Sequence, residues 1–425
     1  MNLKELHIQL RTPFTKERGY GATKIKSVGF ENIYFVVPPA PPEKIDGQLP
    51  AKLLSVALKV IGGLPSIDKA TPLDKLIHYL FVRQEVVCSS RLEGTWSTID
   101  HALTPGEICD KNEGKNQHQA VRCYANILEE MIEVAKQKKE KIFNEDFICK
   151  IHKKIVENDP FATGIPGSLR TEGKSGSIVI IGGGLRRENS IYNPAPPSQV
   201  KRCLREVLDW LGDEKLAQLG DASVGGPSLP IRMAIGHVHF EAVHPFTDGN
   251  GRTGRMLWPL QMVCSGYMPL YLSGYVEKYK DDYRKSLESA QKKLNYIPMI
   301  EFICNAIIET DQENRETRKA IIELERKWQE ISKFRDNSAP RRALKLMLTN
   351  PIICSSFLEK ELGISKTASV DAINALKRKK IIRFRELENR KRIYAAEELI
   401  AILSRPYGSD IDLALERAQR LLQAR

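Results

Sequence analysis

The stretch "HPFTDGNGRTGR", residues 244–255, decides how the rest of this chain is interpreted. Its twelve residues include one histidine, one aspartate, three glycines and two arginines. Pro245 predicts that a preceding helix ends here, because proline lacks the backbone donor that a helix interior needs. The glycines leave little side-chain bulk, so backbone amides can approach a ligand closely. A glycine-rich turn that leads into a helix, as "RTGRMLWPL" at residues 252–260 indicates, is a site where anions bind.

The charged side chains of this stretch have a spacing that suits a chain of phosphates. Arg252 and Arg255 lie three residues apart, so on a helix they share one face and can both reach the same phosphate chain. Asp248 stands where a hard cation such as Mg²⁺ could bridge a carboxylate to those phosphates. His244 is a candidate general base, since histidine changes its charge near neutral pH.

Three other interpretations of these glycines and histidines are weaker. Residues 249–254 fit the GxGxxG dinucleotide fingerprint, but they follow a helix and a proline, and no acidic residue follows about 20 positions later. No Gly-Lys-Ser or Gly-Lys-Thr follows a glycine run, as a Walker A loop requires. A zinc site of His237, His239 and His244 is conceivable, but on a helix the first two point about 200° apart, and no HExxH occurs.

The stretch matches the signature of the Fic family, HxFx(D/E)GNGRxxR, at every defined position. "HVHFEAVHPF" at residues 237–246 and "GGGLRRENSIYNPAPP" at residues 182–197 are also similar to that family. The chain most resembles bacterial Fic proteins that have an N-terminal extension and a C-terminal winged-helix domain. The resemblance implies a mainly α protein, in which a Fic-type helical core with a β-hairpin flap is followed by a winged helix-turn-helix domain.

The resemblance also implies an activity, which is transfer of AMP from ATP to a Tyr, Thr or Ser hydroxyl of an unknown target protein or of the chain itself. His244 would accept the proton of the attacking hydroxyl, and Asp248 would bind Mg²⁺ or Mn²⁺ on the phosphates. Phe246 would be buried and fix the loop. In relatives a second tyrosine often follows the position of Tyr283, whereas residue 284 here is Arg. The implied nucleotide contacts are Gly249, Asn250, Gly251, Arg252, Arg255, Tyr283 and Gln291.

A second short stretch, "CSSRLEGTW" at residues 88–96, ends a predicted helix that covers residues 73–89. Ser89 and Glu93 share one helix face, and Gly94 is a natural helix stop. These residues match the family's inhibitory signature, (S/T)xxxE(G/N). The resemblance implies that Glu93, steadied by Ser89, pairs with Arg255 and withdraws it from the γ-phosphate, because a carboxylate competes with a triphosphate for the same guanidinium donors.

Residues 177–192 contain two β-rich runs around glycines and predict a hairpin. In the family this hairpin is a flap that clamps the target's backbone by strand addition. Elsewhere apolar residues recur at the three/four spacing of amphipathic helices. The predicted helices cover residues 51–62, 73–89, 117–136, 144–159, 199–212, 229–243 and 276–335.

The C-terminal fifth of the chain has a different pattern and a strong basic charge. From residue 341 a helix, a tight turn at 362–365, a second helix and two β-rich runs around "LENR" follow in the order of a winged helix-turn-helix. Residues 341–425 hold 18 Lys and Arg against 10 Asp and Glu, a surplus of 8 within a net charge of +12. An alternative function is therefore that of a regulator that binds DNA. The candidate contacts are Lys377, Arg378, Lys379, Lys380, Arg383, Arg385, Arg390, Lys391 and Arg392.

The length of 425 residues predicts two or three domains, since single cores stop growing near roughly 250–300 residues. We expect an N-terminal helical region with the inhibitory helix at 1–115 and a catalytic core at 116–310. A helical linker at 311–338 and the winged-helix domain with its tail helix at 339–425 complete the predicted division. A further alternative keeps the core and changes the chemistry, so that the site removes AMP or transfers another nucleotide.

The composition is that of a soluble protein, with 42% hydrophobic and 28% charged residues. No apolar stretch approaches the ~20 residues of a membrane span, and the first residues lack the apolar segment of a signal peptide. Eight scattered cysteines without a CxxC favour free thiols in a reducing cytosol. We therefore expect a cytoplasmic protein without membrane contacts. A homodimer is a separate expectation.

Overall fold

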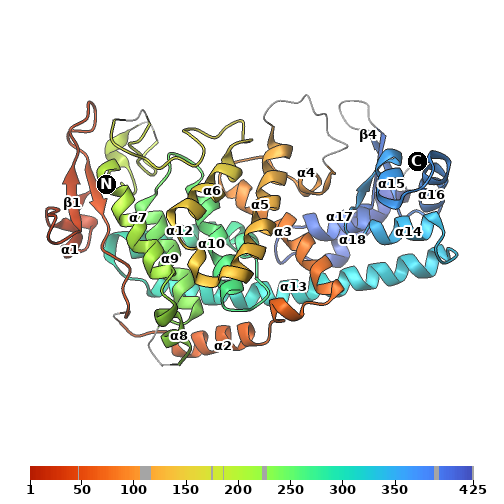
Figure 1. Ribbon diagram of the computed structural model, residues 1–425, viewed down its shortest axis with the longest axis horizontal. Coiled ribbons are helices and arrows are strands. Elements are labelled where there is room, and N and C mark those ends of the chain that lie inside the picture. The colour runs from red at the N-terminus through yellow and green to blue at the C-terminus, as the bar shows by residue number, and fades with distance from the viewer. Residues whose placement is uncertain are drawn as a thin grey trace. The chain divides into compact units, whose positions relative to one another are not determined.

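The computed structural model describes residues 1–45, 47–105, 116–173, 176–184, 186–222, 227–386 and 392–423 (Figure 1). The chain folds into two compact units, and each is described on its own. The first comprises Met1–Lys69 and Asn126–Thr310, and the second comprises Ala70–Ala125 and Asp311–Arg425. Two helices, α5 (Gln117–Lys138) and α13 (Ile297–Ser332), have residues in both units. The division of the chain into functional domains, as expected from the sequence, stays a prediction.

The first unit is built around helix α9 (Leu229–Val243), all of whose residues are buried. A helix that is buried on every side must be covered by neighbours on every side. Figure 1 shows α7 and α10 beside it in the green part of the ribbon. The helices that contact α9 are α2 (Ala51–Gly62), α7 (Pro197–Leu211), α8 (Glu214–Ala222), α10 (Asn250–Cys264) and α12 (Lys280–Lys293).

Helix α6 (Glu145–Val156) packs against α10 and α7, and α11 (Ser273–Lys278) precedes α12. Single 3₁₀ turns occur at Leu3–Glu5, Ile67–Lys69, Lys139–Ile142 and Arg187–Asn189. The predicted helices at 51–62 and 117–136 are confirmed as α2 and α5. The helices at 144–159, 199–212 and 229–243 are confirmed as α6, α7 and α9, with small shifts at their ends.

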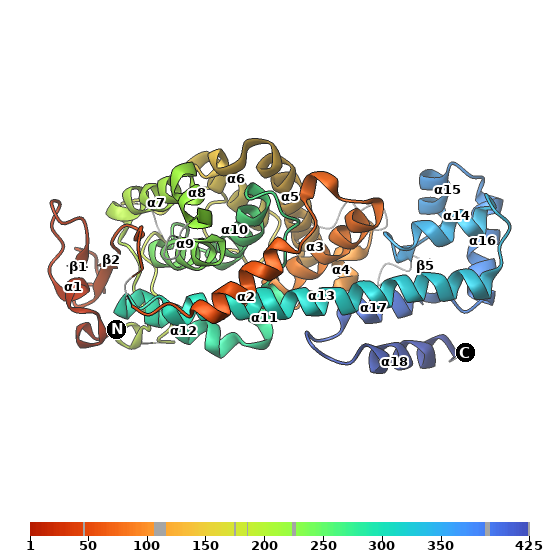
Figure 2. The same cartoon turned by 90° about the horizontal axis from the view of Figure 1, so that it is seen from below.

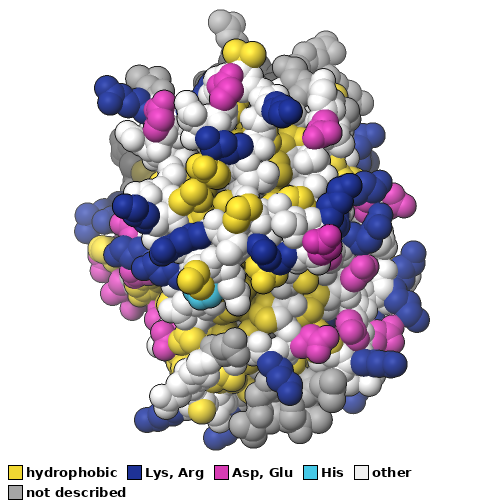
Figure 3. Space-filling model, turned by 90° about the vertical axis from the view of Figure 1, so that its left-hand side faces the viewer, with side chains coloured by type: hydrophobic (Ala, Val, Ile, Leu, Met, Phe, Trp, Pro, Cys, Tyr) yellow, Lys and Arg dark blue, Asp and Glu magenta, His cyan; other side chains and the backbone are white. Residues whose placement is uncertain are grey.

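The N-terminal segment adds a small antiparallel sheet to the first unit. Strand β1 (Gly21–Lys24) pairs with β2 (Tyr34–Val37), and the short helix α1 (Ile8–Arg11) contacts β1. An apolar cluster ties this segment to the rest of the unit, and its members are Leu6, Leu10, Val36, Tyr192 and Ala242. The face drawn in Figure 3 exposes hydrophobic side chains among Lys, Arg, Asp and Glu side chains.

The predicted hairpin at residues 177–192 has less strand pairing than the sequence suggested. Its described residues form one antiparallel bridge, in which the Ile181 N–H donates to the Tyr192 carbonyl at 2.8 Å and the Ile191 N–H donates to the Ile181 carbonyl at 2.7 Å. Gly182 and Gly183 follow in left-handed conformations, with φ of +73° and +87°. These turns redirect the chain at once, so the ladder cannot extend beyond the bridge. Leu185 lies outside the described residues.

The second unit contains helix α3 (Pro72–Leu92), the short α4 (Ile99–Leu103) and the C-terminal elements. Thr71 begins α3 with a capping box, since its hydroxyl accepts from the Asp74 N–H at 3.2 Å and the Asp74 carboxylate accepts from the Thr71 N–H at 2.9 Å. Helix α3 runs to Leu92, three residues beyond the predicted end, and Gly94 follows with φ of +85°.

The C-terminal elements follow the order predicted for a winged helix-turn-helix (Figure 2). Gly363, with φ of +60°, makes the turn between α15 and α16, and both helices pack with α14. A three-stranded antiparallel sheet in the order β3-β5-β4 completes the arrangement. Residues 387–391, which include Arg390 and Lys391, lie outside the described residues. The elements are α14 (Ala339–Leu346), β3 (Ile352–Ile353), α15 (Ser355–Leu362), α16 (Lys366–Arg378), β4 (Arg383–Glu386), β5 (Arg392–Ala395), α17 (Glu397–Ser404) and α18 (Ile411–Gln423).

Within the second unit, α3 and α4 are joined to the C-terminal elements. Gln84 of α3 donates to the Leu403 carbonyl of α17 at 3.3 Å, and α17 contacts both α3 and α4. Arg385 of β4 forms ion pairs with Asp100 of α4 and Glu397 of α17. The sequence had grouped Arg385 with the candidate DNA contacts, but in the structure its guanidinium pairs with these two carboxylates of the same unit.

Candidate active site

The turn after α9 places His244 at the end of a buried helix. His244 is the C-terminal cap of α9, and its N–H donates to the Phe240 carbonyl at 2.9 Å. Its φ of +50° is left-handed, which costs roughly 1–2 kcal/mol for a residue other than glycine. Pro245 favours this break, because a residue before proline is disfavoured in the helical conformation. The surrounding contacts must therefore hold His244 in place.

Glu241, one helical turn before His244, contacts its ring. The distance from Glu241 Oε2 to His244 Nδ1 is 3.4 Å, and both side chains are largely buried. Burial alone would raise the pKa of Glu241, but the neighbouring His244 ring and the positive charge of Arg255 hold that pKa below its usual value. With Nδ1 turned to the carboxylate, Nε2 is the ring atom left to accept a proton. The motif pattern did not single out Glu241, although this residue lies three positions before His244 in the sequence.

Asn250 and Phe246 hold the glycine-rich loop together from inside. Asn250 Oδ1 accepts from the Phe246 N–H at 2.9 Å, and Asn250 Nδ2 donates to the Phe246 carbonyl at 2.8 Å. The Phe246 ring is fully buried, as predicted, and stacks on His152 with 3.7 Å between ring centroids. The side chain of Asn250 is thus used by the loop, so its backbone N–H is the donor that an anion would meet.

His152 supports the same loop and was also missed by the sequence analysis. Its Nδ1 accepts from the Gly167 N–H at 2.9 Å, and its Nε2 lies 2.9 Å from the Asp248 carbonyl oxygen. These contacts require Nε2 to carry the proton and Nδ1 to be the acceptor. Burial lowers the pKa of His152 to about 4, so the ring is neutral at physiological pH.

Asp248 projects a carboxylate whose direction is set by two backbone amides. Its Oδ1 accepts from the Gly249 N–H at 2.6 Å and its Oδ2 from the Thr163 N–H at 3.1 Å. Within the described residues, no group of three or more His, Cys, Asp and Glu side chains could hold a metal ion by itself. A single carboxylate beside a phosphate site fits Mg²⁺, which usually keeps several waters and binds through one or two carboxylates plus substrate phosphates.

Arg252 is held by a buried partner. Its Nη1 donates to Asp159 Oδ2 at 2.6 Å, and both side chains are 5% exposed or less. Asp159 also accepts from the Phe161 N–H at 3.0 Å, which fixes the carboxylate. No local pattern links Arg252 to Asp159, because 93 residues separate them.

Arg255 lies one turn further along α10, and its side chain is buried. Gly254 allows the close approach of α10 to α9, since an added Cβ would lie 2.9 Å from Glu241 Oε1. The close approach of the two helices places Glu241 of α9 beside the first turns of α10. The structure thus places His244 and Asp248 before α10 and both arginines within it, and their roles stay predictions.

Tyr283 and Gln291 lie on α12 and are both buried. The Tyr283 hydroxyl is 2.7 Å from His237 Nε2, and His239 Nε2 is 3.1 Å from the Tyr296 hydroxyl. Burial lowers the pKa of His237 to about 4. The two histidines thus serve different tyrosines within the core, and this arrangement does not favour the zinc alternative.

The residues predicted to be inhibitory, Ser89, Glu93 and Gly94, belong to the second unit. Ser89 is fully buried on α3, and its hydroxyl lies 3.1 Å from the hydroxyl of Tyr124 on α5. Glu93 is the C-terminal cap of α3, and its N–H donates to the Ser90 carbonyl at 3.0 Å. The tyrosine partner of Ser89 was not predicted.

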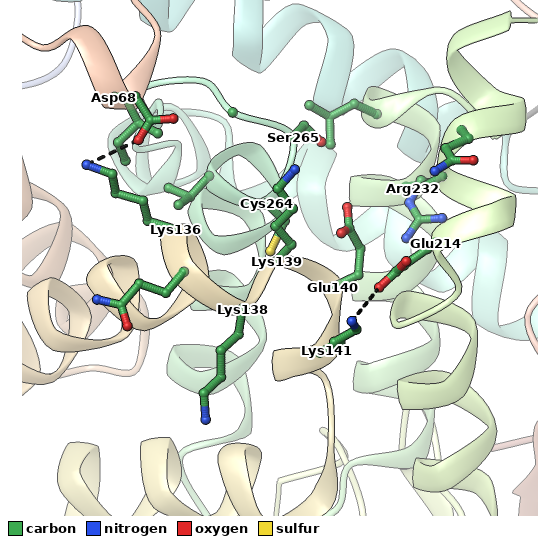
Figure 4. Close-up of a pocket in the computed structure, with 17 residues that line it drawn as sticks. Asp68, Lys136, Lys138, Lys139, Glu140, Lys141, Glu214, Arg232, Cys264 and Ser265 are labelled. Carbon is green, nitrogen blue, oxygen red and sulfur yellow. Dashed lines mark ion pairs between the residues drawn. The ribbon is translucent and has the colours of Figure 1, made fainter.

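A hollow of about 820 Å³ in the first unit is lined by other residues (Figure 4). None of residues 244–255 lines it. Lys136 pairs with Asp68 at 3.3 Å and Lys141 pairs with Glu214 at 3.6 Å, so these lysines already have acidic partners. Cys264 also lines the hollow, and burial raises the pKa of its thiol, which makes it unreactive. The hollow is therefore not the candidate active site.

Comparison with known proteins agrees with this geometry. Residues 142–262 match the Fic/DOC family. A protein adenylyltransferase from Caenorhabditis elegans, fic-1, is 34% identical over 128 residues, which are 30% of this chain and 20% of that protein. A probable protein adenylyltransferase from Aquifex aeolicus is 26% identical over 220 residues, which are 51% of this chain and 58% of that protein. The chain thus covers less than two thirds of each relative.

Among solved structures, a Fic family protein from Desulfovibrio desulfuricans is similar over 84% of this chain and 98% of that chain, with 18% identity and a TM-score of 0.48. Within the described ranges, none of the helices combines the length and apolar composition of a membrane span. The family match covers α6, α7, α9, the loop at 244–255 and most of α10. Residues 142–262 of this chain are therefore similar to the Fic/DOC family.

Proposed function

We propose that this chain is a protein adenylyltransferase that transfers AMP from ATP to a Tyr, Thr or Ser hydroxyl of a protein. The observation that carries the proposal is the loop after α9, where a carboxylate-held histidine precedes a glycine-rich helix N-terminus and two buried arginines. The names of the curated relatives, which are protein adenylyltransferases, support the same activity.

In the proposed reaction the acceptor hydroxyl attacks the α-phosphorus of ATP, and the bond to the β-phosphate oxygen breaks. His244 Nε2 takes the hydroxyl proton, while Glu241 stabilises the ring as it becomes charged. Backbone N–H groups at residues 249–251 face the charge that develops on the α-phosphate. The positive charges of Arg252 and Arg255 stabilise the pyrophosphate as it leaves. Asp248 would hold Mg²⁺ or Mn²⁺, which would supply positive charge to neutralise the phosphates.

Tyr283 and Gln291 are proposed to lie near the nucleotide base. Both are buried on α12, which contacts α9. The hydrogen bond between the Tyr283 hydroxyl and His237 would fix the orientation of the Tyr283 ring. Residues 177–192 are proposed to hold the target's backbone, with Ile181 and Tyr192 pairing at their base.

Labelling with two forms of ATP tests the activity. Purified protein and a cell lysate would be incubated with ATP labelled at the α-phosphate and, separately, at the γ-phosphate. Transfer of AMP retains only the α-label on protein, whereas phosphorylation retains only the γ-label. Absence of α-label from every protein band, with a variant freed from inhibition, would contradict the proposal. Removal of AMP or transfer of another nucleotide would appear as loss of label or as labelling from a different donor.

We also propose that Glu93 inhibits the enzyme by withdrawing Arg255 from the γ-phosphate. The end of α3 supports this role, because buried Ser89 and its Tyr124 partner anchor the last turn and Gly94 stops the helix directly after Glu93. A shift from 1% to about half active needs roughly 2.7 kcal/mol, the scale of one charged hydrogen bond. Glu93→Gly should raise α-labelling, and Glu130→Gly, at an exposed surface pair with Lys150, is the control.

DNA binding by the C-terminal elements is a second candidate function. The end of α16 and the residues that follow expose Lys377, Arg378, Lys379 and Lys380. Arg385 does not add to this surface, because its ion pairs lie within the unit. A gel shift that weakens with salt and disappears on truncation at residue 338 would support the function, and no shift at low salt would exclude it.

The compartment and assembly state complete the proposal. All seven described cysteines are free thiols, which suits a reducing cytosol. A homodimer is proposed from the family resemblance, and sedimentation at several concentrations would test it. The target protein and self-modification would be separated by labelling in the presence and absence of lysate.

A further inference from the structure

Arg170 is a fully buried arginine whose side chain donates to four main-chain carbonyls. Its exposure is 2%. Nε donates to the His244 carbonyl at 2.7 Å, and Nη2 donates to the Val243 carbonyl at 2.9 Å. Nη2 also donates to the Ala195 carbonyl at 2.9 Å, and Nη1 to the Ser177 carbonyl at 3.0 Å. The planar guanidinium thereby joins three separate segments of the chain.

Two of these carbonyls belong to the end of α9. The last carbonyls of a helix have no partner within the helix and carry negative partial charge. A guanidinium satisfies both needs, and burial lowers the pKa of Arg170 only to about 9, so it stays charged at neutral pH. The Arg170 N–H also donates to the Pro245 carbonyl at 2.9 Å. Arg170 therefore forms hydrogen bonds with the main chain before, at and after the left-handed His244.

The other two carbonyls lie at the ends of the segment proposed to hold the target. Ser177 begins that segment and Ala195 follows its last residues, with the Ile181–Tyr192 bridge between them. The Ala195 N–H donates to the Ala242 carbonyl at 3.3 Å, which adds a direct link to α9. One side chain thus sets the distance between the base that accepts the proton and the segment that would present the hydroxyl.

We propose that Arg170 is a positioning residue that aligns the target-holding segment with His244, so that the acceptor hydroxyl meets Nε2 in line with the α-phosphate. The inference rests on the proposed adenylyltransferase function. Arg170 makes none of its bonds to Asp248, Arg252 or the first turn of α10, which are the proposed ATP contacts. Its loss should therefore slow transfer without weakening ATP binding.

The test compares Arg170→Lys and Arg170→Ala with Arg232→Lys in the full chain. Arg232 is a matched control, because it is 5% exposed and donates to the Leu211 carbonyl at the end of α7 at 2.8 Å. The parent is whichever of the wild type or Glu93→Gly is labelled by α-labelled ATP. The kcat and KM for labelling, the Kd for ATP and the melting temperature would be measured for each protein.

We expect kcat to fall about tenfold or more for Arg170→Lys, since a shift of about 1 Å in a reacting group can cost on the order of 100-fold. Lysine offers a compact ammonium in place of a planar fork and cannot reach all four carbonyls. The Kd for ATP should change less than about threefold. Arg232→Lys should keep kcat per folded molecule. Equal kcat values for the two lysine variants, or a loss of ATP affinity that matches the loss of rate, would overturn the inference.

Chemical rescue keeps the test decisive if Arg170→Lys folds poorly. Arg170→Ala leaves a guanidinium-shaped hole, so guanidinium chloride below denaturing concentrations should restore part of kcat, whereas sodium chloride should not. Failure of rescue in a folded Arg170→Ala protein would count against positioning. If no parent protein is labelled at all, the proposed function fails. This outcome differs from labelling whose kcat does not change when Arg170 is replaced, which contradicts only the role of Arg170.

Discussion

The stretch at 244–255 and the basic end of α16 both contain positively charged side chains but differ in how they hold them. In the loop, Arg252 and Arg255 are buried, and Arg252 has a fixed carboxylate partner in Asp159. At the end of α16, residues 377–380 are all exposed. Buried charges act through a low dielectric and are strong and directional, whereas exposed charges are screened by water and salt. The loop can thus support catalysis, and the α16 surface at most salt-dependent binding.

The largest effect that we expect is the fall in labelling rate when His244 in the loop is replaced. His244→Ala should reduce α-labelling by about 100- to 10,000-fold, the usual contribution of a general base. His7→Ala, which removes an imidazole that accepts from the Gln9 N–H near the N-terminus, is the control and should keep the rate. Initial labelling rates of a relieved variant would provide the measurement. A His244→Ala protein that labels at the parent's rate would remove the histidine from the reaction.

The next effect concerns the buried pair of Arg252 and Asp159. Asp159→Asn leaves a buried guanidinium without its carboxylate, so we expect a loss of about 3–5 kcal/mol in the free energy of unfolding. Glu157→Gln breaks the more exposed pair with Lys154 and should cost about 1 kcal/mol or less. Denaturant titration of both variants gives the comparison. Equal losses of unfolding free energy in Asp159→Asn and Glu157→Gln would mean that the buried pair stabilises the protein no more than the exposed pair.

A third effect follows from the buried histidines of the first unit. Burial lowers the pKa of His152 and His237 to about 4 and that of His239 to about 3, whereas the unfolded chain protonates near 6.5. At a pH between the folded and unfolded pKa values, the unfolded chain binds more protons than the folded chain. The stability that the three neutral histidines contribute is therefore complete above about pH 6.5 and is lost as the pH falls toward 4. Melting temperatures measured across this range should decrease toward acid. A smaller slope in His152→Gln would identify its share, and a flat profile for the wild type would contradict the assignment.

The smallest effect is expected on the α16 surface. Lys377→Ala and Lys380→Ala should each weaken DNA binding modestly and reduce the salt slope by about one unit, if each lysine contacts one phosphate. Glu416→Ala, on the exposed face of α18, is the control. Binding curves at several salt concentrations provide the measurement. Tight binding that does not depend on salt would show that this surface is a more specific site than its exposure indicates.

The sequence predicted those features of the fold that depend on residues close together in the chain, such as the positions and ends of helices. The spacing of apolar residues placed α2, α5 and α9, and the Pro245 break located the end of α9. The sequence also indicated that Phe246 would be buried. Helix α3 is longer than predicted, because the helical pattern fades at Ser89 although the stop is Gly94.

The supporting residues could not be predicted in the same way. Asp159 and Arg170 reach the loop from 93 and 74 residues away, and no spacing rule connects them to it. His152 reads as one more residue of an amphipathic helix until the fold brings it against Phe246. The limited pairing at 177–192 likewise follows from the left-handed glycines, whose conformation the composition alone does not determine.

Peptide mass spectrometry of the Glu93→Gly protein is the most direct test of AMP transfer by this site. The Glu93→Gly protein would be incubated with ATP and Mg²⁺, alone and in a lysate, and the products would be analysed by peptide mass spectrometry, with Glu93→Gly/His244→Ala treated in parallel. The account predicts a mass increase equal to one AMP group on a Tyr, Thr or Ser side chain, which is absent from the double variant. An unmodified set of peptides, or the same adduct in both samples, would contradict AMP transfer by this site.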